Sequence, residues 1–247
     1  MNLEQFFTEY PKVALGFSGG VDSAYLLYAA SKYAKEVRAY YVKSAFQPAF
    51  ELEDAKKLAD EIGADLKVIH VDVLKDEQVA ANPPDRCYYC KRQIFGTISS
   101  VAKEDGYTVL LDGTNASDDA DDRPGMKALG ELRVLSPLRL CGLTKQEIRE
   151  RSKEAGLFTW NKPSYACLAT RVATGEKITA EKLEIIEQAE DYLFSLGFSD
   201  FRVRTLQGHA RLEIPKEQTE LLLQHREEIL QKLKESFLSV SLDLNAR

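Results

Sequence analysis

The sequence predicts an α/β protein, with a parallel-sheet domain followed by a small C-terminal α+β domain. Three observations lead to this fold class. Short apolar runs alternate with helical patterns through the first half of the chain, the first run ends in a glycine-rich turn, and the order of helices and strands changes toward the C-terminus. Strands separated by helices are typical of βαβ units, whose parallel sheet carries helices on both faces.

Four apolar runs are the predicted strands of the parallel sheet. They span residues 13–17, 37–42, 66–71 and 107–111. Residues 24–34 repeat apolar side chains at helical spacing, and residues 51–62 read as a second helix. Because ligands of open parallel sheets bind beyond the carboxyl ends of the strands, the loops after the first and fourth runs are the first candidates for a functional site.

The second half of the chain predicts one more helix, a link and a smaller domain. Thr144 and Glu147 form a capping box that begins a helix. Residues 161–175 show little periodicity and are expected to link two domains, which we place at 1–170 and 171–247. The smaller domain has a long predicted helix and three predicted strands, at 179–196 and at 201–205, 210–214 and 239–244.

Composition argues against several classes of protein. Hydrophobic residues make up 44% and charged residues 29% of the 247 residues, as in an ordinary soluble globular protein. No run reaches the roughly 20 apolar residues of a membrane helix, and the first residues lack the features of a signal peptide, so we expect a cytoplasmic protein without a membrane partner. The formal net charge is −6, and residues 176–247 hold 10 Lys and Arg against 14 Asp and Glu, so no nucleic-acid partner is expected.

A glycine-rich loop between the first strand and its helix carries the strongest functional signal. Its candidate phosphate contacts are Ser18, Gly19, Gly20, Asp22 and Ser23. Two glycines let the backbone approach phosphates, and free N–H groups at a helix start point at an anion. Asp22 beside a polyanion is expected either to orient the loop or to help hold Mg²⁺. The loop is not of the Walker A type, because no Gly-Lys-Ser/Thr follows it. A polar turn without a ligand is the alternative.

A second loop follows the fourth strand at the same edge of the predicted sheet. Gly113, Thr114 and Asn115 are its candidate nucleotide contacts, although glycine and asparagine are also ordinary turn residues. Four aspartates come next, at positions 118, 119, 121 and 122, and Arg123 follows them. The aspartates form either a Mg²⁺ site or a solvated loop, and Arg123 is suited to neutralise phosphate charge.

The four cysteines are interpreted as thiols or ligands rather than as disulfides. Cys87 and Cys90 form a C-x-x-C that is half a zinc site, a redox pair or two ordinary cysteines at a helix start. Cys141 has no companion and is treated as structural. Cys167 lies in the segment 162–171, which is rich in reactive side chains, and loops on a rigid scaffold are where such residues concentrate. Three cysteines can hold an iron–sulfur cluster and leave one iron open to an external ligand.

The glycine-rich loop resembles the PP-loop of the N-type ATP pyrophosphatases, which share the pattern SGGxDS and cleave ATP between the α and β phosphates. Within this superfamily the chain is similar to the ATP-dependent sulfur transferases of the LarE type, which help to make the nickel-pincer nucleotide cofactor of lactate racemase. The resemblance runs nearly end to end. It covers SGGVDS at 18–23, DGTNASD at 112–118, DRPG at 122–125, KPSYACLATR at 162–171 and FRVR at 201–204.

The resemblance implies that ATP and Mg²⁺ adenylate a carboxylate of pyridinium-3,5-biscarboxylic acid mononucleotide, after which sulfur replaces the activated oxygen. In one branch of the family the cysteine matching Cys167 gives up its own sulfur, and that branch lacks the C-x-x-C. Cys87 and Cys90 make this chain similar to the other branch, in which three catalytic cysteines bind a 4Fe–4S cluster that carries sulfide. A homo-oligomer, a hexamer built from trimers, is also implied.

Three arginines are the expected contacts of this small-molecule substrate. Arg202 and Arg204 alternate on a strand and therefore face the same side, and Arg171 lies four residues beyond Cys167. Guanidinium forks match phosphate and carboxylate groups, although a solvated strand face is the alternative for the strand pair. The alternatives for the whole protein are a PP-loop tRNA thiolase, an amide-forming adenylating ligase and a nucleotide-binding regulator without turnover.

Overall fold

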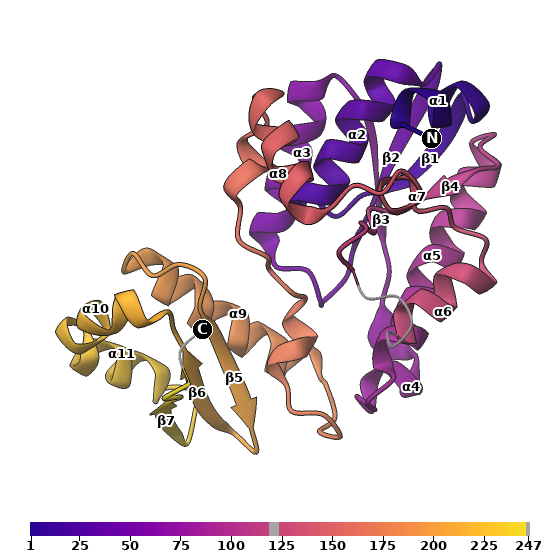
Figure 1. Ribbon diagram of the computed structural model, residues 1–247. Coiled ribbons are helices and arrows are strands. Elements are labelled where there is room, and N and C mark those ends of the chain that lie inside the picture. Colours follow the sequence, from indigo (N-terminus) through magenta and orange to yellow (C-terminus); the bar gives the residue numbers. More distant parts are fainter. Residues whose placement is uncertain (119–123, 246–247) are drawn as a thin grey trace. The chain divides into compact units, whose positions relative to one another are not determined.

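The computed structural model describes residues 1–118 and 124–245, which fall into two compact units (Figure 1). The first unit consists of Met1–Val73 and Asp85–Lys162, and the second of Leu74–Pro84 and Pro163–Arg247. The sequence predicts a domain boundary at residue 170, whereas the second unit begins at Pro163 and also takes in a stretch from the first half of the chain.

The first unit contains a four-stranded sheet in the order β3-β2-β1-β4. Its strands are β1 (Lys12–Gly16), β2 (Glu36–Lys43), β3 (Asp65–His70) and β4 (Leu110–Leu111). Every neighbouring pair is parallel, and Leu15 of β1 lies opposite Ala39 on one side and Leu111 on the other. The predicted α/β fold with a parallel sheet is therefore confirmed. The fourth strand is shorter than predicted, because only two of its residues pair with β1.

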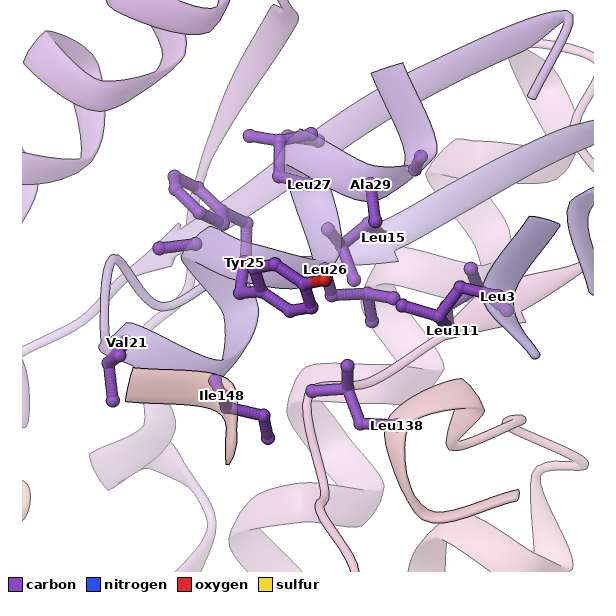
Figure 2. Close-up of a cluster of buried hydrophobic side chains, with 14 of the residues drawn as sticks. Leu3, Leu15, Val21, Tyr25, Leu26, Leu27, Ala29, Leu111, Leu138 and Ile148 are labelled. Carbon is purple, nitrogen blue, oxygen red and sulfur yellow. The ribbon is translucent and has the colours of Figure 1, made fainter. Parts of the chain in front are cut away.

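Helices cover both faces of this sheet (Figure 1). They are α1 (Leu3–Glu9), α2 (Val21–Tyr33), α3 (Ala49–Ile62), α5 (Arg86–Glu104), α6 (Pro124–Glu131), α7 (Pro137–Leu140) and α8 (Lys145–Glu154). Alternate residues of β1 enter different cores, because successive side chains of a strand point to opposite faces. Leu15 packs among residues of α1, α2 and α8 (Figure 2), whereas Ala14 packs among residues of α5 and α6.

The strand order creates a switch point beside β1. The chain runs from β1 to β2 and β3 on one side, and β4 is then added on the other side of β1. At such a point the loops that leave the two neighbouring strands open a space at the carboxyl edge of the sheet. The loops after β1 and β4 are the ones predicted to bind nucleotide.

The second unit is built on a three-stranded sheet in the order β5-β6-β7, with β5 and β6 antiparallel and β6 and β7 parallel. The strands are β5 (Arg202–Leu206), β6 (His209–Glu213) and β7 (Ser239–Leu242), and the helices are α4 (Glu77–Ala80), α9 (Ala180–Ser195), α10 (Thr219–Gln224) and α11 (Arg226–Leu233). Leu193, Phe201 and Val203 lie at the centre of its core and are almost wholly buried. Among the described residues of the chain, no helix has the length and apolar character needed to cross a bilayer.

The stretch Leu74–Pro84 joins the second unit through its backbone. Gly175 donates its N–H to the carbonyl of Asn82 at 2.8 Å, and Ile178 donates to the carbonyl of Ala80 at 2.8 Å. The amide side chain of Asn82 is buried and donates to the carbonyl of Ala173 at 2.8 Å. These bonds were not predicted from the sequence, because their partners are more than ninety positions apart.

Candidate functional site

The loop between β1 and α2 is held by the hydroxyl group of Ser23. This oxygen accepts a hydrogen bond from the Ser18 N–H at 3.3 Å, lies 3.0 Å from Ser18 Oγ and donates to the carbonyl of Gly20 at 3.1 Å. Gly20 is the N-cap of α2, and within the described part of the chain no side chain caps this helix start. The first-turn N–H groups of α2 therefore point outward, as in sites that bind phosphate.

Two glycines allow close approaches at the predicted nucleotide loops, Gly19 to α3 and Gly113 to Ser23. Gly19 has a φ of +72°, and a Cβ atom there would lie 3.3 Å from the Cβ of Ala55, so both its conformation and the available space favour glycine. A Cβ atom on Gly113 would lie 3.0 Å from the backbone nitrogen of Ser23. The loop after β4 thus approaches the loop after β1 backbone to backbone, as the strand order requires.

Asp22 connects these loops to α8. Its carboxylate accepts a hydrogen bond from Asn115 Nδ2 at 3.3 Å and lies 2.5 Å from the ammonium of Lys145, with both charged side chains partly buried. This geometry supports the orienting role for Asp22 that the sequence offered as one alternative. Lys145 was not singled out from the sequence. It directly follows the confirmed helix cap at Thr144, but only the fold shows that α8 begins beside Asp22.

The loop after β4 is stabilised from within. The hydroxyl of Thr114 donates to the buried carboxylate of Asp112, which also accepts a hydrogen bond from Ser136 at 2.5 Å. The backbone N–H of Asn115 donates to Asp118 at 3.1 Å. The other three aspartates of the predicted acidic cluster and Arg123 lie outside the residues that the structure describes.

Cys87 and Cys90 lie at the start of α5, three residues apart and therefore on one side of the helix. Cys87 is exposed and Cys90 is half-buried. Charged groups of both signs lie at this helix start. Arg92 lies over the ring of Tyr88 at 5.6 Å from its centroid and Lys127 of α6 at 5.4 Å, the hydroxyl of Tyr88 donates to Glu131 at 2.7 Å, and Asp85 is the N-cap. The Cys87 thiol is therefore accessible, and both thiols belong to the first unit.

The other two cysteines have different surroundings. Cys141 is half-buried against the core of the first unit, where burial raises the pKa of its thiol, in agreement with the predicted structural role. Cys167 belongs to the second unit and directly precedes a 3₁₀ turn, Leu168–Arg171. All four cysteines are described, and none forms a disulfide. Among the described residues no three His, Cys, Asp or Glu side chains form a group able to hold a metal ion.

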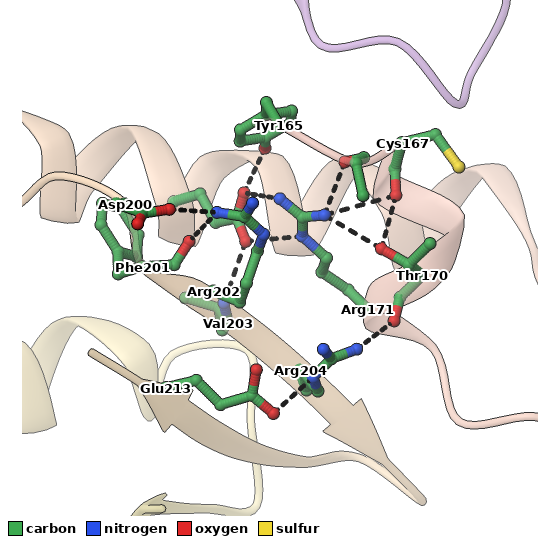
Figure 3. Close-up of polar contacts among 12 residues, drawn as sticks. Tyr165, Cys167, Thr170, Arg171, Asp200, Phe201, Arg202, Val203, Arg204 and Glu213 are labelled. Carbon is green, nitrogen blue, oxygen red and sulfur yellow. Dashed lines mark hydrogen bonds and ion pairs between the residues drawn. The ribbon is translucent and has the colours of Figure 1, made fainter. Parts of the chain in front are cut away.

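The three predicted arginines are engaged within the second unit (Figure 3). Arg171 is completely buried, and its guanidinium donates to both carboxylate oxygens of Glu190, at 2.9 and 3.1 Å. Arg202 is almost as deeply buried and donates to the carbonyl of Ser164 at 2.5 Å. The solvated strand face offered as the alternative for Arg202 is therefore wrong. Arg204 donates to Glu213 and to the carbonyl of Thr170, both at 2.5 Å.

A cavity of about 650 Å³ lies in the second unit beside β5 and β6. Its lining includes Thr170, Arg204, Gln207, His209 and Arg211. The side chain of Arg204 is 35% exposed, against 0% for Arg171 and 4% for Arg202. Arg204 is thus the one of the three predicted arginines with a substantial accessible surface.

Comparison with known proteins supports one family over the whole chain. The family profile described as queuosine biosynthesis protein QueC matches residues 12–82. An uncharacterized protein of Synechocystis sp. is 38% identical over 98% of this chain and 92% of its own length. The pyridinium-3,5-bisthiocarboxylic acid mononucleotide synthase of Lactiplantibacillus plantarum is 32% identical over 94% of this chain and 86% of its own length.

A second group of relatives matches only part of the chain. The tRNA-specific 2-thiouridylase MnmA of Fervidobacterium nodosum is 29% identical over 61% of this chain and 54% of its own length. Three observations support the same family. Two relatives match both units, the QueC profile matches the first strands, and the parallel sheet carries the expected loop at the start of α2. The chain belongs to the LarE family of ATP-dependent sulfurtransferases, within the PP-loop superfamily.

Proposed function

We propose that this chain activates a carboxylate of pyridinium-3,5-biscarboxylic acid mononucleotide with ATP and converts it to the thiocarboxylate. The name and the nearly complete coverage of the Lactiplantibacillus plantarum relative support this substrate class. The observation that carries the proposal is the close approach of Gly113 to Ser23. It brings an uncapped helix start, two serine hydroxyls and the Asp22–Lys145 pair to the carboxyl edge of one sheet.

In the first step a carboxylate oxygen of the substrate attacks the α-phosphorus of ATP, and pyrophosphate leaves. The first-turn N–H groups of α2 and the ammonium of Lys145 would stabilise the charge that develops on the phosphate oxygens. Mg²⁺ takes oxygen ligands, mostly from phosphates and water, and would supply further positive charge there. Asp22 is the carboxylate that this loop offers to such an ion.

In the second step a sulfur nucleophile attacks the acyl carbon of the adenylate. The carbon–sulfur bond forms, the bond from that carbon to the phosphate oxygen breaks, and AMP leaves with the electron pair. The substrate carries a phosphate and carboxylates, which arginine recognises through paired N–H donors. We assign this recognition first to Arg204, because it lines the cavity of the second unit and is accessible there. Arg171 and Arg202 were predicted for the same role. All three arginines donate to groups of the chain itself, but the side chains of Arg171 and Arg202 are also almost wholly buried.

The thiols of Cys87, Cys90 and Cys167 suit a 4Fe–4S cluster in their donor chemistry. The spacing of Cys87 and Cys90 puts both thiols on one side of the first turn of α5, where the partial positive charge of the helix start favours an anionic group. Cys167 is the third proposed ligand of the cluster. When bound, the cluster would supply an iron with an open position that is able to carry sulfide.

An anaerobic assay of iron and acid-labile sulfide tests the cluster. We expect a brown protein with about four irons per chain, and a large loss of iron in Cys167→Ala. Cys141→Ser is the matched control and should keep the iron, because this cysteine belongs to the core of the first unit. A colourless protein that carries zinc would contradict the cluster but not the adenylation.

Mass spectrometry of the product tests the reaction itself. With ATP, Mg²⁺ and sulfide, the mononucleotide should gain sulfur in place of oxygen, and AMP and pyrophosphate should appear together. Thiolation of bulk tRNA with the mononucleotide left unchanged would favour a tRNA thiolase instead. The partial coverage of the tRNA-specific relative argues against that outcome.

The proposal includes two further predictions about the protein as a whole. By family resemblance we expect a homo-oligomer, with a hexamer as the predicted form, and a location in the cytoplasm. Light scattering coupled to size-exclusion chromatography checks the first. A monomer at micromolar concentration would contradict it. Cell fractionation checks the second.

A further inference from the structure

Three arginine side chains hold the segment that carries Cys167, residues 164–170, by hydrogen bonds to its backbone carbonyl groups. Arg202 donates to the carbonyl of Ser164 at 2.5 Å, Arg171 to that of Ala166 at 2.6 Å, and Arg204 to that of Thr170 at 2.5 Å. The sulfur atom of Cys167 points away from all three guanidinium groups (Figure 3). The arginines therefore hold the backbone on both sides of Cys167 and leave its thiol on the outer side.

Glu190 of α9 lies at the centre of these contacts. Its carboxylate receives both donors of the Arg171 fork, the hydroxyl of Tyr165 and the backbone N–H of Val203, the last at 2.9 Å. The ring of Tyr165 is contacted by two of the arginines, at 4.4 Å from the Arg171 guanidinium carbon and 5.0 Å from that of Arg202. Glu190 thus determines where both Arg171 and Tyr165 lie.

The Arg171 guanidinium keeps its charge although it is buried. Burial lowers the pKa of the Arg171 guanidinium, but the hydrogen bonds and charge of Glu190 outweigh it, and the net shift is upward. A buried ion pair adds little stability compared with apolar side chains of the same volume, because both ions lose their hydration. Stability is therefore a weak reason for this pair. A fully hydrogen-bonded buried network does fix one arrangement of the groups that it joins.

We infer that Glu190 is a positioning residue for Cys167. Through Arg171 and Tyr165 it fixes the backbone of residues 164–170, so that the Cys167 thiol is presented in one place on the outer side of the segment. The inference rests on the proposed function only in taking Cys167 as a working cysteine. It assigns Arg171 to the support of the segment rather than to contact with the substrate.

Alkylation of Cys167 tests the inference without ATP or substrate. In the full chain with Cys87, Cys90 and Cys141 changed to serine, the rate of reaction with iodoacetamide is measured at fixed pH, together with the midpoint of thermal unfolding. Glu190→Gln removes the charge, and Tyr165→Phe removes one hydroxyl. We expect both folded variants to react at least about fivefold faster, because a loosened segment exposes its sulfur more often.

Two further variants separate positioning from stability. Glu184→Gln lies on the exposed side of the same helix and should react at the parent rate. Arg171→Lys keeps a positive charge beside Glu190 but loses the paired N–H donors of the guanidinium. Its midpoint of thermal unfolding should therefore be higher than that of Arg171→Met, while its Cys167 should still be alkylated faster than in the parent. Folded Tyr165→Phe and Glu190→Gln proteins that react at the parent rate would overturn the inference. Failure of sulfur transfer alone would leave it standing, since the alkylation does not depend on that reaction.

Discussion

The phosphate loop and the Cys167 segment are both irregular stretches with functional side chains, but they are stabilised differently. The hydrogen bonds that shape the loop at Ser18–Ser23 join residues at most five positions apart. Two of the three arginines that hold residues 164–170, Arg202 and Arg204, reach the segment from 38 and 34 positions away. The third, Arg171, lies five positions from its carbonyl partner but is itself held by Glu190, 19 positions away. A locally closed loop can be recognised as a motif, whereas a segment held from a distance can be recognised only by its sequence resemblance or in the folded chain.

Asp22 of the phosphate loop is an exception to this contrast. Its carboxylate is bonded to Asn115 and to Lys145, which lie 93 and 123 positions away. The first three of the following changes are directed at one side of the comparison and the fourth at neither, and they are ordered from the largest expected effect to the smallest.

The largest effect is expected from Arg171→Met, which removes the long-range support of the Cys167 segment. It leaves the carboxylate of Glu190 buried without its cation, so the free energy of unfolding of the second unit should fall by about 3–5 kcal/mol. Urea unfolding measures the loss, and calorimetric titration should show unchanged ATP binding. Arg211→Met is the control: this arginine also pairs with carboxylates but is 54% exposed, so its loss should cost less than about 1 kcal/mol. Equal losses for the two variants would contradict the prediction.

Lys145→Met tests the exception. Removal of a charged donor beside Asp22 should weaken ATP binding by about tenfold to hundredfold, equivalent to about 1.5–3 kcal/mol for a hydrogen bond to a charged group. Calorimetry on the anaerobic protein measures the dissociation constant. Lys153→Met removes an exposed lysine of the same helix and should leave the affinity unchanged. If both variants bind ATP as the parent does, Lys145 has no part in the phosphate site.

Gly113→Ala tests the close approach of the two nucleotide loops. The added Cβ would lie 3.0 Å from the backbone nitrogen of Ser23, so the loops must separate slightly. The free energy of unfolding should fall by about 1–2 kcal/mol, as in other overpacked sites, and ATP binding should weaken with it. Gly96→Ala is the matched control within α5, where the new Cβ would meet no atom within 4 Å. It should stabilise the protein by about 0.5–1 kcal/mol. A loss of stability in this control would show that the free space around a glycine does not predict the effect of an added Cβ in this protein.

The smallest effect concerns Asp105, which takes its hydrogen bonds from β2 and β3 rather than from either loop. The ammonium of Lys67, followed by Tyr40 and Arg38, holds the pKa of its carboxyl below the ordinary value of 3.8. Because the folded chain binds this proton less readily, the stabilisation is present at higher pH and is lost as the pH falls from about 5 through the lowered pKa. Asp105→Asn should flatten this part of the stability curve in acid unfolding experiments. An unchanged curve would contradict the assignment.

Much of the first unit could be predicted because its signals are local. The four strands, the capping box at Thr144 and the adjacency of the loops after β1 and β4 follow from apolar spacing, cap chemistry and the rules of parallel sheets. The stretch Leu74–Pro84 was missed, because its partners lie in the second unit. Glu190 was missed as well. A glutamate on a helix is usually exposed, and nothing near it in the chain indicates that Arg171 will be buried beside it.

The sequence by itself determined the superfamily, the phosphate loop and the alternation of strands and helices. These depend on glycines, serines and apolar residues whose effect reaches only a few positions along the chain. Only the tertiary structure decided what the arginines do. A guanidinium binds whichever carboxylate or carbonyl the fold brings to it, and burial makes that internal partner necessary. All three arginines therefore became supports of the Cys167 segment, and Arg204 alone among them kept a substantial accessible surface in the cavity.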